Sequence, residues 1–567
     1  MDDAVVGRVI GTEDATPLEF WVAIADGRFL QLDDVVALAR TPPGRDPVRI
    51  YGIVTQVRAR HEGARFDSDV FLIEDGVLPA EVCEAAQILA TRFEPEMFVP
   101  PLPGQPVRRA EGVERHEALF FDGMVRRLPA GLSRDDEPVY VNFEFLDGTR
   151  GAHVNISGVS GVATKTSYAT FLLHSLFTSG VLGGAVNTKA LVFNVKGEDL
   201  LFLDRPNLKL DEGQRDRYRR LGLEATPFGS VELWAPPRRG ATTAAADTGS
   251  RSEGVRAFFW TIEEFCADGL LEFLFADAQD DRQHYTMVVH NVMARLKEAA
   301  PTGDGGVTID GVTVRTFRAL VDVIRDRVED DDPVVRERWA GRAIGQGTVH
   351  AFVRRLYGTQ RHVEHLIRGD VAHPDRHRIT RHAQVTVVDI HNLNDRAKRF
   401  VVGVTLRRAF DDKERSGQAD PLLFVVLDEL NKYAPRDGSS PIKELLLDVA
   451  ERGRSLGIIL IGAQQTASEV ERRVIANSAV RVVGRLDSAE ASREEYGFLP
   501  TAHRQRATIV KPGTMILAQP ELPVPLVLEF PFPAWATRAV EAADAEPGAH
   551  PADPFEGLTA DIDTGLP

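Results

Sequence analysis

The chain has 567 residues, of which 43% are hydrophobic and 27% are charged, and its formal net charge at pH 7 is −17. This length exceeds one ordinary domain, so we expect a large core with one or two smaller units. The acidic balance excludes a protein coated in basic surface that wraps nucleic acid, although a narrow basic channel inside a ring remains compatible with it.

Hydropathy, the N-terminal stretch and the cysteine count indicate the cellular compartment and whether a zinc site is present. No apolar run reaches the ~18 residues of a membrane helix, and "MDDAVVGRVIG" lacks a signal-peptide pattern, so we expect a cytoplasmic protein without membrane association. The two cysteines, Cys83 and Cys266, lie far apart in the sequence and favour buried thiols over a disulfide framework or a zinc site.

The first segment, residues 1–150, predicts a small β-barrel. Short runs rich in Val, Ile and Phe are separated by Gly, Pro and Asp, as in "VVGRVIGTE", "LEFWVAI" and "VRIYGIVTQVRAR". Several short strands at this spacing are typical of a barrel that forms its own domain.

From about residue 151 the pattern becomes strand, loop, helix and strand. "HVNISG", the helical "SYATFLLHSLFTSG" and "KALVFNVKG" form a βαβ unit, which predicts a parallel sheet. The same alternation returns at "AQVTVVDI" and continues through "PLLFVVLDEL", "IILIGAQQ" and "SAVRVVGRL". The predicted fold class is therefore α/β, with a core over residues 151–535.

Three further segments interrupt or follow this core. Residues 236–254, "PPRRGATTAAADTGSRSEG", lack large apolar side chains and predict a flexible loop. Residues from about 255 to 382 are mostly helical in pattern and predict a helical insertion. The last segment, 536–567, is rich in Ala, Pro and acidic residues and predicts a disordered tail.

The stretch "NISGVSGVATKTS" contains the parts of a phosphate-binding loop. Gly158 and Gly161 allow close backbone approach, Lys165 supplies the positive charge, and Thr166, followed by Ser167, supplies a hydroxyl for magnesium. Such a loop binds an anion because backbone N–H groups at a helix N-terminus point toward it.

This loop departs from the usual pattern in two ways. From Gly158 to Lys165 it is one residue longer than G-x-x-x-x-G-K-[ST], and Thr164 stands where glycine is usual. A β-branched residue strongly disfavours positive φ, so the loop cannot follow the standard path unaltered. Taken alone, the stretch fits a nucleotide site and a glycine-rich turn about equally.

A second motif favours the nucleotide site. "LLFVVLDEL" is an apolar strand that ends in Asp428 and Glu429, as in P-loop NTPases, where one acid holds magnesium and the next orients or activates water. A loss of function would first remove residues whose only use is chemistry. Because Lys165, Thr166, Asp428 and Glu429 are all retained, we interpret the loop as modified but functional.

Two other polar groups remain open to alternative interpretations. "IILIGAQQ" ends in Gln464 and Gln465, where an amide could contact a γ-phosphate or simply face a loop. "LLLDVAERGRSLG" carries Arg452 and Arg454, which could act on a neighbouring subunit's ATP or could be solvated surface charges.

The order "HVNISGVSGVATKTS", "VVLDELNKYAP", "AERGRSLGIILIGAQQ" and "NSAVRVVGRL" resembles the HerA family of the HerA–FtsK P-loop ATPases. The resemblance spans about residues 6–533 and is most specific over 424–486. It implies a hexameric ATPase with RecA-like cores that hold ATP and Mg²⁺ between subunits and translocate double-stranded DNA. It also implies a barrel for assembly and partner docking, and a nuclease or other effector as partner.

The resemblance also assigns roles to individual residues. It implies that Lys165 and Thr166 bind phosphate and magnesium, that Asp428 holds the metal and that Glu429 activates water. It implies further that Gln464 senses the γ-phosphate, that Arg454 acts in trans with Arg452 in reserve, and that Glu198 of "NVKGEDL" is a weaker candidate acid.

Other interpretations of the chain are less well supported. One alternative is an assembly scaffold, in which nucleotide only locks the ring and the barrel recruits an effector, for example in phage defence. An ATP-dependent enzyme acting on a small molecule lacks a recognisable second substrate site. The histidines of "HVEH" and "AHPDRHRITRH" do not have the spacing of a zinc protease and favour structural or surface roles.

Overall fold

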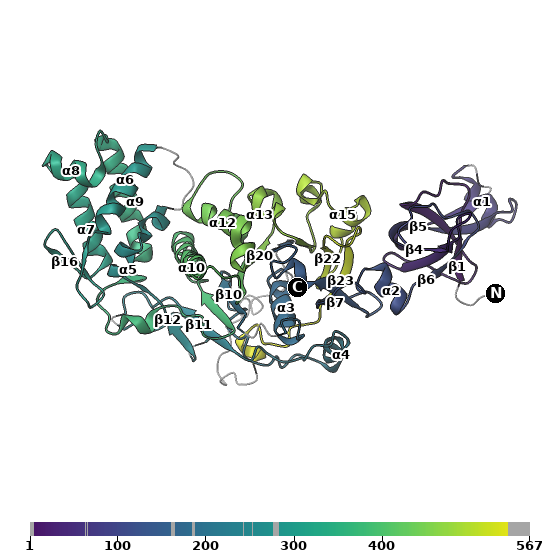
Figure 1. Cartoon of the computed structure of the whole chain (residues 1–567), viewed down its shortest axis with the longest axis horizontal. Helices are drawn as coiled ribbons and strands as arrows, with labels where there is room; N and C mark the ends of the chain where they lie inside the picture. Colours follow the sequence, from purple (N-terminus) through teal and green to yellow (C-terminus); the bar gives the residue numbers. More distant parts are fainter. Residues whose placement is uncertain are drawn as a thin grey trace, which may run out of the picture.

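The computed structural model of the chain places a helical insertion, a helix-covered central sheet and a β-barrel in a row (Figure 1). It describes residues 5–62, 64, 66–159, 165–183, 187–241, 243–251, 253–275 and 283–542. None of the helices in these ranges combines the length and the low charge that a membrane-spanning segment requires.

The N-terminal strands close into the predicted barrel, in the order β1-β2-β5-β4-β3-β6. Its neighbouring strands are antiparallel, and inward-facing apolar side chains such as Val22, Ile50 and Ile88 form a separate core cluster. The strands are β1 (Val5–Val9), β2 (Glu19–Ile24), β3 (Val35–Arg40), β4 (Val48–Glu62), β5 (Glu81–Glu94) and β6 (Pro106–Arg109).

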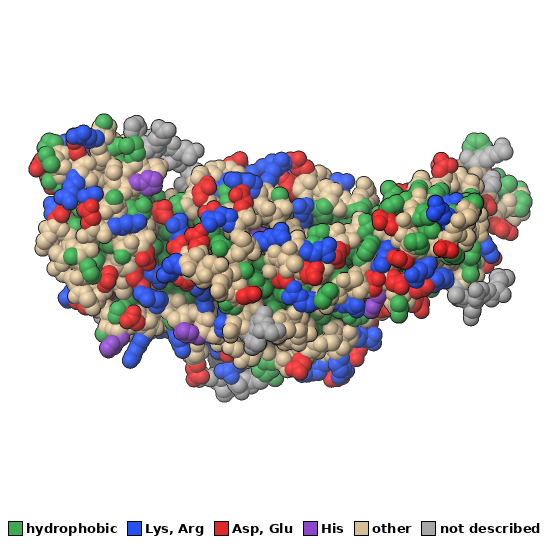
Figure 2. All heavy atoms as spheres, viewed as in Figure 1, with side chains coloured by type: hydrophobic (Ala, Val, Ile, Leu, Met, Phe, Trp, Pro, Cys, Tyr) green, Lys and Arg blue, Asp and Glu red, His purple; other side chains and the backbone are tan. Residues whose placement is uncertain are grey.

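The long strands β4 and β5 extend into a hairpin that carries α1 (Asp69–Glu74). None of the residues of α1 is buried, and Phe71 is 67% exposed. Hydrophobic side chains accordingly gather on the barrel, at the right of Figure 2. This part of the barrel is an unusually apolar surface for an acidic protein.

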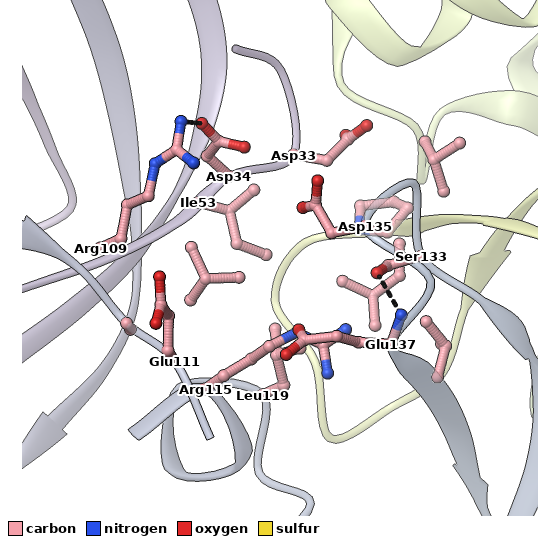
Figure 3. A pocket seen from close by; sticks show the side chains of 16 residues that line it. Asp33, Asp34, Ile53, Arg109, Glu111, Arg115, Leu119, Ser133, Asp135 and Glu137 are labelled. Atoms are coloured by element: carbon pink, nitrogen blue, oxygen red, sulfur yellow. Dashed lines mark hydrogen bonds and ion pairs between the residues drawn. The ribbon is translucent and has the colours of Figure 1, made fainter. Parts of the chain in front are cut away.

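The barrel ends at Arg109, before residue 150. The next elements are α2 (Val113–Ala118), β7 (Arg127–Leu132) and β8 (Pro138–Asn142), of which β7 and β8 pair with the central sheet. Ion pairs across the junction join Asp33 to Arg506 at 2.6 Å and Asp34 to Arg134 at 3.3 Å. They border a cavity of about 290 Å³ between barrel and core, shown in Figure 3.

The central sheet has twelve strands in the order β12-β11-β18-β10-β19-β20-β9-β21-β22-β23-β7-β8. Neighbours from β12 to β21 are parallel, and the remaining strands form an antiparallel extension. The new strands are β9 (Val154–Ser157), β10 (Lys189–Asn194), β11 (Val231–Ala235), β12 (Val255–Ala257), β18 (Val385–Asp389), β19 (Leu423–Leu427), β20 (Ile458–Gln464), β21 (Val480–Val483), β22 (Thr514–Ala518) and β23 (Leu526–Glu529). The predicted α/β class is confirmed.

Helices cover both faces of this sheet. In β19, Val425 and Leu427 belong to the cluster that includes α10 (Asp395–Ser416) and α12 (Pro441–Leu456). Phe424 and Val426 belong to the cluster on the opposite face, which includes α3 (Lys165–Thr178). Burial on both faces explains why these strands are continuous apolar runs rather than alternating ones. Further helices are α4 (Glu212–Arg220), α11 (Leu430–Tyr433), α13 (Arg472–Ala476), α14 (Ser488–Ala491) and α15 (Thr501–Ala507).

The helical insertion follows β12 and packs on the cluster around α10. Its helices are α5 (Ile262–Ala267), α6 (Gln283–Leu296), α7 (Phe317–Val328), α8 (Pro333–Ala340) and α9 (Gln346–Val363). It also contains a small sheet of β14 (Ala300–Pro301), β15 (Val307–Ile309) and β16 (Val312–Val314), and a pair formed by β13 (Trp260–Thr261) and β17 (Ile367–Arg368).

Two segments that lack periodicity are partly packed. In the loop 236–254, Arg251 is 8% exposed and forms an ion pair with Asp204, so the prediction of a flexible loop is wrong for this part. Of the predicted tail, Ala536 and Ala542 are buried, and residues 543–567 lie outside the described residues. Local composition missed these contacts because both depend on distant parts of the chain.

Candidate functional site

The carboxyl ends of five adjacent parallel strands, β9, β20, β19, β10 and β18, meet at one edge of the sheet. In open α/β sheets this edge is the usual place for a ligand, because the chain turns away there and exposes side chains and helix N-termini. Gly158, Asp428, Glu429 and Gln464 lie on these strand ends or directly after them. Lys165, Thr166 and Ser167 form the first turn of α3, the helix that follows β9.

Lys165 begins α3 directly above the end of β9. Its side chain is buried, and its Nζ has no hydrogen-bond partner within the described part of the chain. Burial lowers the pKa of Lys165. Gly158 is in close contact with the chain, since a Cβ there would lie 3.3 Å from the Arg485 carbonyl oxygen. Gly161 and Thr164 lie outside the described residues.

Thr166 and Asp428 meet although they are 262 positions apart in the sequence. The Thr166 hydroxyl donates a hydrogen bond of 2.8 Å to Asp428 Oδ2. The other carboxylate oxygen, Oδ1, accepts the backbone N–H of Glu429 at 2.7 Å, which fixes the orientation of a side chain that is 6% exposed. Ser167, the next residue of α3, is partly exposed.

Glu429 is held by two lysines. Its carboxylate pairs with Lys196 at 2.7 Å and with Lys432 at 3.0 Å. Burial raises the pKa of Glu429, but the hydrogen bonds from Lys196 and Lys432 outweigh it, so the pKa is lowered overall. The backbone of Glu429 has a φ of 57°, the left-handed region that non-glycine residues rarely adopt. An outlier of this kind stores strain at a position that the surrounding structure holds in place.

Gln464 is fully buried and already has partners. Its amide nitrogen donates to Asn155 Oδ1 at 2.8 Å and to Ser157 Oγ at 2.9 Å, and its oxygen accepts from Asn155 at 3.3 Å. Gln465 is the exposed residue of the pair. In this structure Gln464 therefore links β20 to β9.

The two arginines do not lie at this edge. Arg454 is near the C-terminus of α12, which precedes β20, and so lies at the amino edge of the sheet. Its guanidinium donates to the carbonyl oxygens of Gly148 and Thr149 at 2.8 and 2.6 Å. Arg452 pairs with Glu414 and lies over the Phe410 ring.

Polar residues at the ends of β10 and β18 complete the edge. Asp389 is 1% exposed. Its carboxylate accepts a hydrogen bond from Asn194 Nδ2 and forms another with His391 Nδ1, both at 2.8 Å. The hydrogen bond to Asp389 raises the pKa of His391. Glu198 accepts the backbone N–H of Ser250 at 2.7 Å, so it stabilises the neighbouring loop.

Sequence reasoning missed several residues at this edge. Lys196 stands two positions before Glu198 in "NVKGEDL", and Lys432 lies one turn after Glu429. Asp389 had a usable signal, because it ends a buried apolar strand in the same way as Asp428. The two lysines had no such signal, since an isolated lysine after a strand is usually a solvated charge.

The residues present fit a magnesium-bound nucleotide. Lys165 offers a buried ammonium that has no hydrogen-bond partner among the residues the structure describes, and a bound phosphate would compensate its charge. Thr166 and Asp428 offer a hydroxyl and a carboxylate in contact with each other, and oxygen ligands of this kind suit Mg²⁺. Glu429, one residue further, is a second carboxylate next to Asp428.

Comparisons with known proteins give limited similarity. No protein-family model matches the chain, and no curated protein matches its sequence. VirB4 of Thermoanaerobacter pseudethanolicus is 15% identical, with a TM-score of 0.42 over 71% of this chain and 96% of that chain. Plasmid coupling protein TrwB in complex with ADP and Mg²⁺ is 12% identical, with a TM-score of 0.42 over 68% and 87%. The genome packaging NTPase B204 from Sulfolobus turreted icosahedral virus 2 in complex with ATP-gammaS is 11% identical, with a TM-score of 0.21 over 27% and 70%.

Proposed function

We propose that this chain is a P-loop ATPase that uses ATP and Mg²⁺. The contact between Thr166 and Asp428 carries this proposal, because it joins the phosphate-loop helix to the acidic strand at 2.8 Å. Lys165, the residue before Thr166, is buried, and the described part of the chain supplies no hydrogen-bond partner for its Nζ. Residues that serve only chemistry have no other reason to converge at the carboxyl edge of the sheet.

Each residue has a defined task in this proposal. Lys165 binds the β- and γ-phosphate oxygens and neutralises their charge, which is the main requirement of phosphoryl transfer. Thr166 and Asp428 hold Mg²⁺, which when bound stabilises negative charge on the phosphates. Glu429 orients the attacking water, and Gln465 or Gln464 lies at the strand end where a γ-phosphate would be sensed.

Glu429 needs a rearrangement before it can act. Its carboxylate is engaged by Lys196 and Lys432, and its lowered pKa makes it a weak base. We expect nucleotide binding to draw one lysine toward the phosphates, since opposite charges compete for the same ammonium group. The chain therefore has a resting state in which hydrolysis is slow.

We infer further that the ATPase is of the HerA type, with RecA-like cores in a ring of six subunits that translocates double-stranded DNA. The order of barrel, parallel sheet and helical insertion supports this inference. The position of Arg454 supports it as well. The seven residues of β20 span about 23 Å from the amino edge to the carboxyl edge of the sheet. This distance is too long for Arg454 to reach a nucleotide bound to its own subunit. In a head-to-tail ring it would serve a neighbour.

The barrel is proposed to dock the neighbouring subunit or an effector such as a nuclease. Large apolar side chains are exposed on and around α1, including Phe66 at 71% and Phe71 at 67%. Surfaces of this kind on soluble proteins mark interaction sites. We also propose a cytoplasmic location, where the chain and its partner would both have access to DNA.

The test is steady-state ATP hydrolysis by the full chain, with and without duplex DNA, beside Glu429→Gln. We expect turnover that rises with DNA and falls by at least about a hundredfold in the variant, because a positioned base typically contributes that much. Turnover that persists unchanged in Glu429→Gln would contradict the assigned site.

A nucleotide-locked scaffold is the second candidate function. The paired lysines on Glu429 favour it, since they would keep hydrolysis slow, and the exposed α1 offers a docking surface. Under this alternative ATP binding depends on Lys165 but DNA does not accelerate turnover. The same assay with a nucleotide-binding measurement on Lys165→Ala separates the two functions.

A further inference from the structure

A second pocket lies where the loop between β11 and β12 meets the helical insertion. It has a volume of about 340 Å³ and is bordered by the N-terminus of α7, the end of α9 and β17. It lies far from the phosphate loop, because β11 and β9 are five strand spacings apart, or about 24 Å. Its charged lining consists of Arg238, Arg239, Arg318, Arg361, Arg368, Glu364 and Asp370.

One arginine of the pocket is structural. Arg368 is 8% exposed and forms a two-pronged pair with Asp370, at 2.9 Å for both hydrogen bonds. It also donates to the carbonyl oxygen of Ala241 at 3.1 Å, which ties the loop to β17. With this pair neutralised, the other four arginines of the lining face a single carboxylate, Glu364. The pocket therefore has a strong positive potential within an acidic chain.

A buried histidine in the lining has an unsatisfied nitrogen. His365 is 8% exposed, and its Nδ1 has no hydrogen-bond partner among the described residues. Burial, with Arg239 and Arg368 nearby, lowers the pKa of His365 to about 4, so the ring is neutral at physiological pH. The Nδ1 atom itself is buried, so it lies within the wall of the pocket and not on its accessible surface.

The N-terminus of α7 adds backbone donors to the same pocket. Thr316 caps this 12-residue helix, and its hydroxyl accepts the N–H of Ala319 at 3.2 Å. Phe317 and Arg318 occupy the first helical positions, where N–H groups have no acceptor within the helix. A helix N-terminus carries partial positive charge and is a common binding place for phosphate.

We propose that this pocket binds a phosphoryl anion, held by Arg239, Arg318 and the N-terminus of α7. Arginine suits this task because its planar guanidinium can donate two parallel hydrogen bonds to a phosphoryl group. The ionic pair of Arg368 and Asp370 keeps the wall in place. The phosphoryl group can belong to a free polyphosphate or to a nucleic-acid backbone.

The test uses the full chain with Lys165→Ala, so that the phosphate loop does not contribute. Inorganic pyrophosphate is titrated calorimetrically at low ionic strength into this parent and into Arg239→Gln and Arg318→Gln added to it. We expect affinity to fall at least about tenfold in each, as the loss of one charge-assisted hydrogen bond predicts. Both side chains are exposed, so neither substitution should disturb folding.

The matched control is Arg342→Gln in the same background. Arg342 lies on the insertion, does not line the pocket, and its side chain is 92% exposed, so this variant has the same charge change and should keep the parental affinity. A parent that does not bind pyrophosphate, or equal losses in all three variants, would overturn the proposal.

A second arm distinguishes the sources of the phosphoryl group. Binding of a fluorescent duplex DNA is measured with the same proteins. If Arg239→Gln weakens both pyrophosphate and DNA, the pocket receives a backbone phosphate; if it weakens pyrophosphate alone, the ligand is a free polyphosphate. If DNA binding falls equally in Arg239→Gln and Arg342→Gln, the effect is general charge and DNA is excluded as the source.

Discussion

At the scale of single residues, the proposed catalytic base is held more tightly than a working base needs to be. The Glu429 carboxylate pairs with Lys196 and Lys432, and its backbone, which is left-handed, donates its N–H to Asp428. Each lysine stabilises the ionised form, and this stabilisation exceeds the effect of burial on the pKa of Glu429. The two lysines therefore set the pH range in which the base is ionised.

Replacing both lysines by methionine should shift the pH dependence of hydrolysis. Glu429 must be ionised to accept a proton, so activity falls as the pH drops through its pKa. In the native chain this pKa is lowered and the loss occurs below about pH 4.5. In Lys196→Met/Lys432→Met the two hydrogen bonds that lower the pKa of Glu429 are lost. Burial then raises this pKa and moves the acidic limb to higher pH.

The measurement is kcat/KM between about pH 3.5 and 8, a range that includes the ordinary carboxylate pKa of about 4.3 and therefore the acidic limb of the native chain. Lys511→Met is the control, because it removes an exposed lysine that pairs with Glu529 elsewhere on the sheet. An unchanged acidic limb in the double variant, with a normal one in the control, would show that Glu429 is not the group that titrates.

At the scale of elements, the buried strands were the most predictable parts of the site. "LLFVVLDEL" predicted a core strand that ends in two acids, and β19 is buried throughout, with Asp428 directly after it. Strands covered on both faces are continuous apolar runs, and such runs are visible in a sequence. Because parallel strands place their carboxyl ends at the same edge, the sequence also predicted where the acids of β19 lie in the sheet.

Pairing between distant segments was not predictable in the same way. β7 and β8 join the central sheet and not the barrel. Their local sequences did not predict this, because the residues of a strand do not specify which of two sheets it pairs with. Likewise, the lysines on Glu429 and the arginines around His365 come together from separate elements. Their roles depend on tertiary contacts, which composition and spacing do not encode.

The end of β20 separates two neighbouring glutamines. Gln464 is the last residue of β20, and Gln465 follows the strand. Gln464 is fully buried and hydrogen-bonded to Asn155 and Ser157, whereas Gln465 is exposed. The two residues should therefore have separable roles.

We expect Gln464→Ala to lower stability and Gln465→Ala to lower turnover. Removing the Gln464 amide takes away three buried hydrogen bonds to Asn155 and Ser157, at a cost of about 2 kcal/mol or more in the free energy of unfolding. Gln465→Ala removes an exposed side chain and should change stability by less than about 0.5 kcal/mol. Denaturant unfolding and ATPase rates of both variants are the measurements.

The reverse pattern would return the γ-phosphate role to Gln464. If Gln464→Ala is as stable as the native chain but slow in hydrolysis, its amide must leave Asn155 during the reaction. Gln464→Glu serves as a control of similar size, because a buried carboxylate beside Asn155 should destabilise the strand pair through its charge.

At the scale of the whole molecule, the two edges of the central sheet are proposed to belong to different active sites. Lys165 and Asp428 lie at the carboxyl edge, and Arg454 lies at the amino edge beside Gly148 and Thr149. A ring that places the amino edge of one subunit against the carboxyl edge of the next would complete each site from two chains. Such a site would be inactive in a single chain.

Mixed rings of Lys165→Ala and Arg454→Ala subunits test this arrangement. Each variant alone should be nearly inactive. In rings formed by co-expression at equal amounts, about a quarter of the interfaces would combine an intact phosphate loop with an intact arginine, and activity should recover in proportion. If Arg454 instead acts within its own subunit, every chain in the mixture carries one defect and nothing recovers.

Arg452→Ala is the matched control for the arginine. Arg452 is two positions away on the same helix and pairs with Glu414, so its loss should leave hydrolysis close to the native rate. Arg454→Ala also removes two hydrogen bonds to the loop at Gly148, and thermal unfolding of both variants measures that structural part. Recovery in the mixture cannot come from stability, because the Arg454→Ala subunits keep that defect in every ring. A quarter of the native rate from two inactive chains would therefore place the arginine in its neighbour's site.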